Sequence, residues 1–423
     1  MTAKIHFIGA PEVVGRAAFL IEEEKHQVIL DYGVELTKPP KFPLTVPPRY
    51  VDALILTHAH LDHVGASPYL YVSGNMPLYV TKPTLELTEI LIKDFIKLSG
   101  EFLPFEYLDF VYMSQRAVYM DYREEVHVPD SPFRLEFLDA GHIPGSAQVV
   151  VKVGGKKILY TGDINNYETR LQKPADINYD EDYDVVIVES TYGADIHPKR
   201  DRLEKVFVEK VTEIVENGGI ALIPAFAVGR SQEILLILRQ RGFKHRIIMD
   251  GMALEVTEIL LRHKDFLKSP RSLKRAYGKV KKVRRWKERR RAVKEGGVII
   301  APAGMLGGGS AVFYISKLYK DPKNAIFLVG YQAPGTPGRV LLEEGIVMVE
   351  STSAKAEAKR YFFEFSSHTD MEGLRRLLSS LSGDPVIMIV HGEERGRMGL
   401  KNLAEEMGFK THLPVSGETY VLR

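Results

Sequence analysis

The sequence contains no cysteine, which excludes disulfide bonds and thiolate metal sites. Its 423 residues include no apolar run near the ~18 residues of a membrane-spanning helix, so we expect no membrane span. The first residues also lack the apolar core of a signal peptide and read as a strand, which favours a cytoplasmic location. Any transition metal in this chain must therefore be held by histidine and carboxylate side chains.

Net charge is almost absent too, because 57 Lys and Arg residues face 55 Asp and Glu residues. The balance hides one basic segment, Arg271–Lys294, which has 13 Lys and Arg residues, one acidic residue and the sole tryptophan. A solvated surface helix would explain this segment, and so would a contact surface for a polyanion, with Tyr277 and Trp286 stacking on bases. The second interpretation predicts phosphate contacts from five arginines: Arg284, Arg285, Arg289, Arg290 and Arg291.

The expected elements change in style along the chain. Short strands separated by turns dominate residues 1–190, whereas helices and strands alternate from about residue 200, as in a mostly parallel sheet. After the Gly/Pro-rich stretch Gly330–Arg339 the earlier style returns. We therefore expect an α/β protein in which residues 201–340 form a domain inserted between residues 1–200 and 341–423 of a first domain.

Histidine and aspartate cluster where the expected strand Ala53–Leu56 ends. The cluster consists of His58, His60, Asp62 and His63. These spacings do not fit one face of a helix, but a loop could turn the first two side chains toward one metal ion and the last two toward a second. Imidazole and carboxylate are the ligands that zinc accepts in the absence of cysteine.

Three further candidate ligands each follow an expected apolar strand: His142, Asp163 and His391. Each of them alone is a weak signal. Together they repeat one arrangement, in which a strand delivers a ligand to the same edge of a sheet. The repetition predicts a two-metal site, and a metal pair suits the hydrolysis of a phosphodiester.

The run His58–His63, followed by His142 and Asp163, resembles the metallo-β-lactamase fold, an αββα sandwich that alone does not define function. The remainder resembles the β-CASP nucleases of this superfamily, and the matching segments are Glu189–Gly193, Ile223–Glu233, Gly307–Gly309, Gly330–Arg339, Ser366–Asp370 and His391. The chain looks most similar to archaeal relatives of the cleavage and polyadenylation specificity factor nuclease, with RNase J as a near cousin. The resemblance implies a metallo-β-lactamase sandwich with an inserted β-CASP domain.

The resemblance also implies a function and a set of site residues. The expected function is hydrolysis of single-stranded RNA, by endonucleolytic cleavage, 5′-to-3′ trimming or both. Two zinc ions are implied, one bound by His58, His60 and His142, the other by Asp62, His63 and His391, with Asp163 bridging. His368 is implied as proton donor to the leaving oxygen, with Glu189 holding it. Asp31 is implied to orient the metal loop, and DNA-directed members typically lack a histidine like the one at position 391, which favours RNA.

Phosphate contacts are expected in the second half of the chain. A glycine-containing turn precedes an expected helix at Arg230 and Ser231, so backbone N–H groups there could face an anion. A glycine cluster allows close approach of a backbone, and two serines adjoin the implied acid. These further candidates are Gly307, Gly308, Gly309, Ser366 and Ser367.

Two other functions remain open from the sequence. The chain could hydrolyse a small ester or thioester on the same fold, although the inserted domain and the basic segment argue against a small substrate. It could also bind RNA as a non-catalytic scaffold, although every ligand position is filled. The expected partners are single-stranded RNA and either a second copy of the chain, in a homodimer, or an RNA-processing complex. Endonuclease or exonuclease action, sequence preference and oligomeric state stay undecided.

Overall fold

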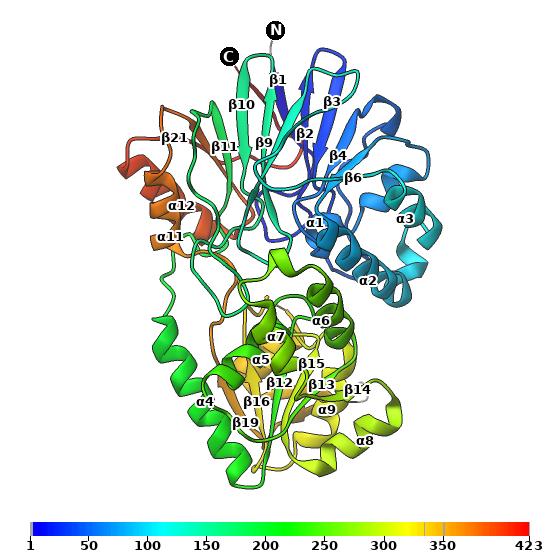
Figure 1. Ribbon diagram of the computed structural model, residues 1–423, viewed down its shortest axis with the longest axis vertical. Coiled ribbons are helices and arrows are strands. Elements are labelled where there is room, and N and C mark those ends of the chain that lie inside the picture. The colour runs from blue at the N-terminus through cyan, green and yellow to red at the C-terminus, as the bar shows by residue number, and fades with distance from the viewer. Residues whose placement is uncertain (1–2, 334, 350–351, 423) are drawn as a thin grey trace. The chain divides into compact units, whose positions relative to one another are not determined.

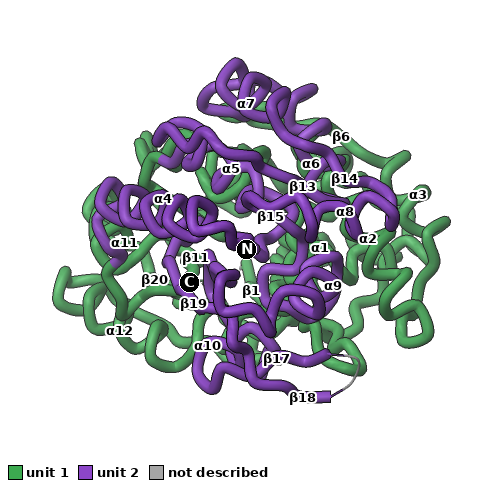
Figure 2. The backbone as a smooth tube through the Cα atoms, turned by 90° about the horizontal axis from the view of Figure 1, so that it is seen from below, with its two compact units in different colours: residues 1–168, 173–196, 368–423 green, residues 169–172, 197–367 purple. Residues whose placement is uncertain are grey.

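The computed structural model describes residues 3–333, 335–349 and 352–422, so Pro334 of the Gly330–Arg339 stretch lies outside the described residues. The chain forms two compact units, drawn in different colours in Figure 2. Unit 1 comprises Met1–Glu168, Lys173–Ile196 and His368–Arg423, and unit 2 comprises Thr169–Gln172 and His197–Ser367. Residues 341–367, expected in the first domain, thus lie in unit 2, because a strand there pairs in parallel with the sheet of unit 2.

Unit 1 contains two sheets, each of seven strands in the described part of the chain (Figure 1). The first sheet has the order β22-β1-β2-β3-β4-β5-β6. Its strands are β1 (Ala3–Phe7), β2 (Phe19–Glu23), β3 (His26–Leu30), β4 (Ala53–Ile55), β5 (Leu78–Val80), β6 (Ala117–Tyr119) and β22 (Thr419–Val421). Alternating burial in β1 matches a strand with one face toward a core.

The second sheet has the order β21-β20-β11-β10-β9-β8-β7. Its strands are β7 (Glu125–His127), β8 (Arg134–Asp139), β9 (Ala147–Val153), β10 (Lys156–Tyr160), β11 (Val185–Glu189), β20 (Val386–Val390) and β21 (Lys410–His412). Strand β9 is antiparallel to both β8 and β10, while β10, β11 and β20 pair in parallel. Strands β8, β10, β11 and β20 therefore all end at the same edge of the sheet.

Helices cover the outer face of each sheet of unit 1, and the inner faces pack together. Between the sheets lies an apolar core that includes Phe7, Phe19, Phe137 and Ile187. Helices α1 (Leu61–Val64), α2 (Lys82–Ser99) and α3 (Tyr107–Ser114) bury side chains against the first sheet, and α11 (Met371–Ser379) and α12 (Glu394–Glu406) bury theirs against the second. This αββα arrangement confirms the predicted fold of the first domain.

Unit 2 is built on a six-stranded parallel sheet of order β14-β13-β15-β12-β16-β19 among the described residues. Its strands are β12 (Ile220–Ala225), β13 (Ile247–Asp250), β14 (Lys281–Val283), β15 (Gly297–Pro302), β16 (Ala325–Leu328) and β19 (Lys359–Phe362). The helices are α4 (Arg200–Glu216), α5 (Arg230–Gln240), α6 (Met252–Arg262), α7 (Pro270–Tyr277), α8 (Trp286–Glu295), α9 (Gly309–Leu318) and α10 (Pro337–Glu344). A separate hairpin pairs β17 (Ile346–Val349) with β18 (Thr352–Lys355). No helix among the described residues of either unit is both long and apolar enough to cross a lipid bilayer.

Candidate metal centre and active site

The strand ends of unit 1 bring the expected ligands to one place. His142 follows β8, Asp163 follows β10 and His391 follows β20, and these strands end at the same sheet edge. In the other sheet, β4 runs into the loop that carries His58 and His60. The predicted arrangement, in which each apolar strand delivers a ligand to a common edge, is the arrangement that the structure has.

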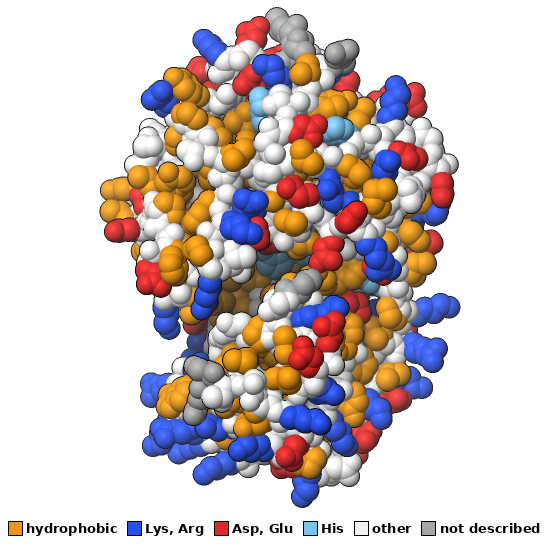
Figure 3. Space-filling view, turned by 180° about the vertical axis from the view of Figure 1, so that it is seen from behind, with side chains coloured by type: hydrophobic (Ala, Val, Ile, Leu, Met, Phe, Trp, Pro, Cys, Tyr) orange, Lys and Arg blue, Asp and Glu red, His pale blue; other side chains and the backbone are white. Residues whose placement is uncertain are grey.

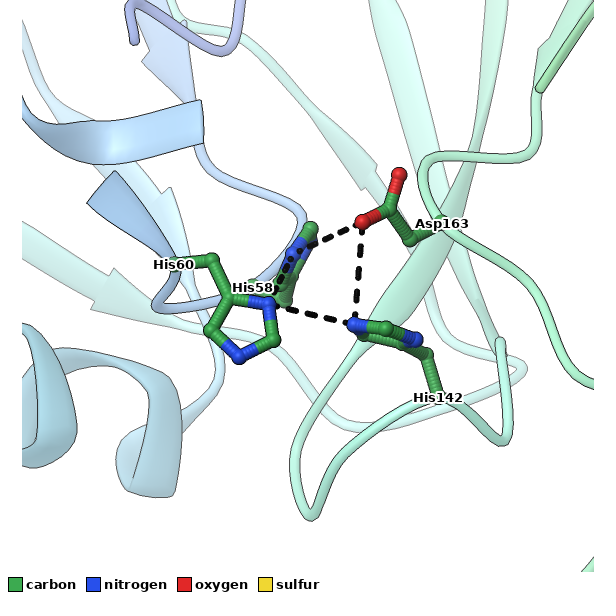
Figure 4. A group of neighbouring side chains, drawn as sticks. All are labelled: His58, His60, His142 and Asp163. Carbon is green, nitrogen blue, oxygen red and sulfur yellow. Dashed lines mark hydrogen bonds and ion pairs between the residues drawn. The ribbon is translucent and has the colours of Figure 1, made fainter. Parts of the chain in front are cut away.

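Three histidines and one aspartate form a first ligand group, His58, His60, His142 and Asp163, drawn in Figure 4. The Nδ1 atom of His60 lies 3.2 Å from Nε2 of His58 and 3.1 Å from Nε2 of His142. Oδ2 of Asp163 lies 3.4 Å from Nε2 of His58 and 3.6 Å from Nε2 of His142. The four atoms therefore converge on one point rather than dispersing over the surface.

These separations fit a zinc ion. In a tetrahedral site with ligands at ~2.0–2.1 Å, neighbouring donor atoms lie about 3.3 Å apart. The measured values of 3.1 to 3.6 Å fall on either side of that figure. His58 and His142 are buried and so is Asp163, so the donor set is shielded from water. Three imidazoles and a carboxylate in this geometry suit zinc better than magnesium or calcium, which prefer oxygen ligands.

A second group, Asp62, His63 and His391, lies beside the first. The Nε2 atoms of His63 and His391 are 3.4 Å apart, and Nε2 of His391 lies 3.4 Å from Oδ2 of Asp62. Helix α1 places Asp62 and His63 directly after the first-group histidines, and the tight turn after β20 presents His391 with a left-handed backbone, φ 50°. Non-glycine residues in this conformation carry strain that surrounding structure must hold, as is common at functional sites.

Asp163 lies between the two groups. Its Oδ2 atom faces the first group, while Oδ1 lies 3.2 Å from Nε2 of His63 and 3.4 Å from Nδ1 of His391. Oδ1 accepts no hydrogen bond from any residue that the structure describes, although Asp163 is buried. A buried carboxylate oxygen without a hydrogen bond is costly in a protein, and a cation between the groups would satisfy it.

Asp31 fixes the orientation of the ligand loop from behind. Its carboxylate accepts hydrogen bonds from the backbone N–H and the hydroxyl of Thr57, each over 2.8 Å, and from the hydroxyl of Tyr160 over 3.0 Å. It also accepts the Nδ1–H of His63 over 2.7 Å, which leaves Nε2 of that ring as the atom available to a metal. The sequence did not predict a role for Thr57 or Tyr160 in the site. Thr57 directly precedes His58, and Tyr160 ends β10, just before the turn that bears Asp163.

Glu189 and His368 form a hydrogen-bonded pair in unit 1. Nδ1 of His368 lies 2.9 Å from Oε1 of Glu189, the last residue of β11. Nε2 of the same ring lies 4.0 Å from Oδ2 of Asp163. The ring of His368 therefore bonds to a carboxylate through one nitrogen and points the other toward the ligand groups. That is the geometry of a histidine positioned to donate or accept a proton beside a metal site.

Burial and neighbouring charges divide the histidines into two kinds. Burial, with neighbouring histidines, lowers the pKa of His58, of His60 to about 3, and of His142 well below the ordinary value. These rings are neutral at pH 7, the form that binds a metal. For His63 and His391 burial also lowers the pKa, but the surrounding carboxylates together outweigh burial and raise the pKa of each; they are Asp163 and Asp31 for His63, and Asp163 and Asp62 for His391. Metal binding would displace those protons.

His368 belongs to the second kind. Burial lowers its pKa, but the carboxylates of Glu189 and Asp163 outweigh burial and raise the pKa to about 9. The ring is thus protonated at neutral pH. The pKa of Asp163 shifts the other way. Burial raises it, but the charges of the neighbouring histidines, His391 and His63 first, outweigh burial and hold the pKa well below its ordinary value.

The expected phosphate-binding residues lie in unit 2, and they differ in burial and in their hydrogen-bond partners. Ser231 is fully buried and its hydroxyl donates to the carbonyl of Phe226, so it is no longer a candidate phosphate ligand. Nη2 of Arg230 donates to Oγ of Ser367 over 2.9 Å, which brings two candidates together. Ser366, which directly precedes Ser367 in the sequence, is buried.

The glycine cluster precedes α9. Gly308 is the N-cap of α9, and an added Cβ at Gly307 or Gly308 would meet nothing within 4 Å. Gly309 has φ +66°, and a Cβ there would lie 2.9 Å from the carbonyl oxygen of Pro302. The first two glycines therefore leave the backbone open at a helix N-terminus, while the third is required by the turn itself.

Family models match three stretches of the chain. Their descriptions are the metallo-beta-lactamase superfamily at residues 12–207, the Beta-Casp domain at residues 231–341, and the Zn-dependent metallo-hydrolase RNA specificity domain at residues 353–414. The fold, the clustered ligands and these matches define a metallohydrolase with a metal-binding site in unit 1. The chain belongs to the β-CASP family of the metallo-β-lactamase superfamily, as the sequence resemblance predicted.

Several curated relatives align with nearly the whole chain. The "RNase aCSPSF2" of Saccharolobus solfataricus is 42% identical, over 98% of this chain and 84% of that protein. The "Probable RNase MJ4" of Methanocaldococcus jannaschii is 38% identical, over 98% and 99%. The "Transcription termination factor FttA" of Pyrococcus horikoshii is 33% identical, over 99% and 71%. A solved structure of a protein of unknown function from Enterococcus faecalis covers both chains fully with a TM-score of 0.63 at 15% identity, which shows the fold alone.

Proposed function

We propose that this protein is a two-zinc ribonuclease that hydrolyses phosphodiester bonds of single-stranded RNA. One observation carries the proposal: a histidine held by a carboxylate lies beside two ligand groups, with Asp163 between them. A small-substrate hydrolase on this fold needs the ligand groups, but it has no evident use for that histidine. A scaffold protein needs neither.

The first zinc would be held by His58, His60 and His142, and the second by Asp62, His63 and His391, with Asp163 contributing one oxygen to each. A bound zinc pair would supply Lewis acidity toward phosphoryl oxygens and a water nucleophile near neutral pH. The chain's own part is to keep three imidazoles neutral by burial and to fix the ring of His63 through Asp31.

His368 would protonate the leaving oxygen. Glu189 binds its Nδ1–H, so the proton to be transferred sits on Nε2, the nitrogen that faces the ligand groups. The same Oε1 atom of Glu189 accepts the backbone N–H of Ile164 over 2.9 Å, which fixes the carboxylate rigidly relative to the Asp163 turn. A general acid held this way contributes about 10²–10⁴-fold to rate.

RNA as substrate is supported by the family and by the relatives. Two of the relatives are named as RNases, and the C-terminal family model is described as an RNA specificity domain. His391 fills the ligand position that favours RNA in this family. We assign phosphate contacts in unit 2 to the open backbone at Gly307 and Gly308 and to the paired Arg230 and Ser367. Backbone N–H groups at a helix N-terminus suit phosphate oxygens.

The test is cleavage of RNA labelled at its 5′ end and, separately, at its 3′ end, with zinc present and after chelation. Zinc-dependent products support the proposal, and their lengths separate internal cleavage from stepwise trimming. RNA bound but never cleaved, with two zinc ions present per chain, would favour the scaffold. Cleavage of a thioester without cleavage of RNA would favour the small-substrate hydrolase. Light scattering on the same sample tests whether the protein acts as a homodimer.

A further inference from the structure

The outward face of α8 in unit 2 carries only cations. Four residues lie at positions i, i+3, i+4 and i+7 of this helix and share one face. They are Lys287, Arg290, Arg291 and Lys294, called here the α8 stripe, and all four are exposed. The opposite face buries Ala292 in the core of unit 2. Figure 1 places α8 at the lower right of unit 2. Figure 3 is turned by 180° about the vertical axis, so that side lies at the lower left, where Lys and Arg side chains gather.

No acidic side chain of the described residues forms an ion pair with the stripe. Within the described residues, none of its four members makes a side-chain hydrogen bond or an ion pair. The two acids of α8 serve its ends instead. Glu288 accepts the backbone N–H groups of Arg284 and Arg285, and Glu295 pairs with Lys281. Arg291 lowers the pKa of both acids only through space.

The stripe weakens the helix that carries it. Lys287 and Arg291 are four residues apart, as are Arg290 and Lys294, and like charges at this spacing destabilise a helix. A helix that served only as a solvated surface would gain from alternating charges. Glu288 and Glu295 offset this repulsion only in part, through Arg291, so an external anion would stabilise the stripe further.

Three residues of the basic segment that the sequence offered to RNA are instead engaged within unit 2, which corrects part of the prediction from sequence. Nη2 of Arg284 pairs with Glu258 over 2.6 Å, and Arg289 binds the fully buried carboxylate of Asp250 over 2.8 Å. Tyr277, predicted to stack on bases, is 5% exposed and donates its hydroxyl to Glu258. Helices α7 and α8 also lie at separate places of unit 2 in Figures 1 and 2, so the segment is not one surface.

An exposed aromatic ring borders the stripe. Trp286 lies one turn before Arg290 and is 54% exposed. Its ring centroid lies 4.6 Å from that of Phe313, and the guanidinium of Arg289 lies 5.9 Å from it. The indole is thus supported from the protein side and free on the other. A ring held in this way can stack on a base at little cost in side-chain entropy.

We propose that the α8 stripe and Trp286 bind single-stranded RNA, with phosphates on the stripe and a base on the indole. The proposal rests on the proposed ribonuclease function and names where unit 2 holds the substrate chain. An acidic protein segment would match the charge but would offer no base to the exposed indole. The combination of regularly spaced cations with a supported aromatic ring is the usual composition of a single-strand binding surface.

The test compares two triple variants with the same change in charge. One is Lys287→Gln/Arg290→Gln/Arg291→Gln. The control removes three exposed lysines of unit 1, Lys25, Lys38 and Lys410, in the same way. A fluorescent single-stranded 12-mer RNA is titrated at several salt concentrations, with EDTA present throughout so that no cleavage occurs. Each phosphate contact contributes about −0.7 to the slope of log affinity against log salt.

The stripe variant should flatten that slope by up to about 2, while the control keeps the slope of the unaltered protein. Trp286 is the sole tryptophan, so RNA should also quench the intrinsic fluorescence of the unaltered protein. Trp286→Ala should weaken binding about tenfold. The melting temperature of the stripe variant should stay level or rise, since like-charge pairs are removed.

Equal slopes for the stripe variant and the control would overturn the proposal. So would an unchanged RNA slope accompanied by lost binding of poly-glutamate, which would assign the stripe to an acidic protein. A separate cleavage assay with zinc distinguishes the two levels of inference. If the stripe variant flattens the slope but the protein never cleaves RNA, the ribonuclease proposal is wrong and the RNA-binding role of the stripe stands. If the protein cleaves RNA but the slopes are equal, the ribonuclease proposal stands and the RNA-binding role of the stripe is wrong.

Discussion

His368 and the backbone of Ile164 share one acceptor, the Oε1 atom of Glu189, each over 2.9 Å. Ile164 directly follows Asp163, so this carboxylate ties the expected general acid to the turn that bears the expected bridging ligand. The backbone N–H of Thr369 donates in return to the carbonyl of Ile164 over 2.7 Å. Residues from two distant parts of the sequence are thereby held in register at the sheet edge.

His368→Ala should keep both metal ions and slow RNA cleavage by about 10²–10⁴-fold, because it removes only the proton donor. Single-turnover rates and metal content measured on one preparation check this. His127→Ala, an exposed histidine of β7, is the control and should cleave normally. A normal rate for His368→Ala would place the acid elsewhere.

Glu189→Gln should slow cleavage and also move its pH profile. Burial lowers the pKa of His368, and Glu189 is the largest influence that raises it, to about 9. The protonated acid is present below its pKa and lost above it, so the alkaline limb should move to lower pH when Glu189 loses its charge. Rates measured from pH 6 to 10 test this. A slower enzyme with an unmoved limb would show that Glu189 is only structural.

Asp163→Ala should lose both metal ions together, because each ligand group uses one of its oxygens. His142→Ala removes a ligand from the first group alone and should cost one ion. Metal per chain, measured by mass spectrometry, distinguishes the two results. Asp121→Ala changes an exposed aspartate and should retain full metal content. Two zinc ions and full turnover in Asp163→Ala would disprove the bridging role.

Asp31→Asn should weaken zinc binding by about 10–100-fold, since second-layer partners of metal ligands typically have that effect. The amide cannot accept all the hydrogen bonds that orient His63 and Thr57. Tyr160→Phe removes one donor and leaves the carboxylate intact, so its effect should be smaller. Competition with a chelator of known affinity gives both values. Equal losses would mean that general packing, and not the carboxylate, holds the loop.

Unit 2 should lose stability in acid through Glu204. Burial raises the pKa of this carboxyl, but contacts with Arg170, Arg241 and Arg200 outweigh burial and lower it. Its contribution is therefore complete above the unfolded pKa of about 4.3 and lost as pH falls through the lower folded value. Glu204→Gln should cost about 2 kcal/mol at pH 7 and progressively less as the pH falls below about 4.3.

Melting curves of the unaltered protein and Glu204→Gln between pH 3 and 7 check the sign. Glu213→Gln is the matched control, because Glu213 lies on the same helix and pairs at the surface with Lys210. Exposed pairs contribute little, so the control should melt normally at every pH. A gap between the unaltered protein and Glu204→Gln that widens in acid would contradict the prediction.

The sequence predicted the fold class and the family through the resemblance of its motifs. It predicted the positions that converge at the sheet edge because candidate ligands directly after apolar strands indicate both burial and topology. It did not predict the end of the inserted domain. The strand Lys359–Phe362 looks like any other edge strand, and only its pairing with β16 assigns it to unit 2. The prediction that Tyr277 and all five arginines of the basic segment contact RNA was wrong in part, for a related reason. The composition of the segment does not show that Arg289 and Tyr277 are already engaged, because their partners lie elsewhere in the sequence. Arg289 pairs with Asp250, and Tyr277 donates to Glu258.

The order in which the two units can fold during synthesis follows from the way unit 1 is assembled. Strand β1 pairs with β22, and β11 pairs with β20, so both sheets need residues from the last part of the chain. Unit 2 is almost continuous, from His197 to Ser367. Because domains generally fold as units while the ribosome advances, unit 2 can be complete while unit 1 still lacks His368 and His391. A nascent chain therefore acquires its metal site only after His391 has been synthesised, and a ribosome stalled upstream of residue 391 would carry a folded unit 2 together with an incomplete and catalytically silent unit 1.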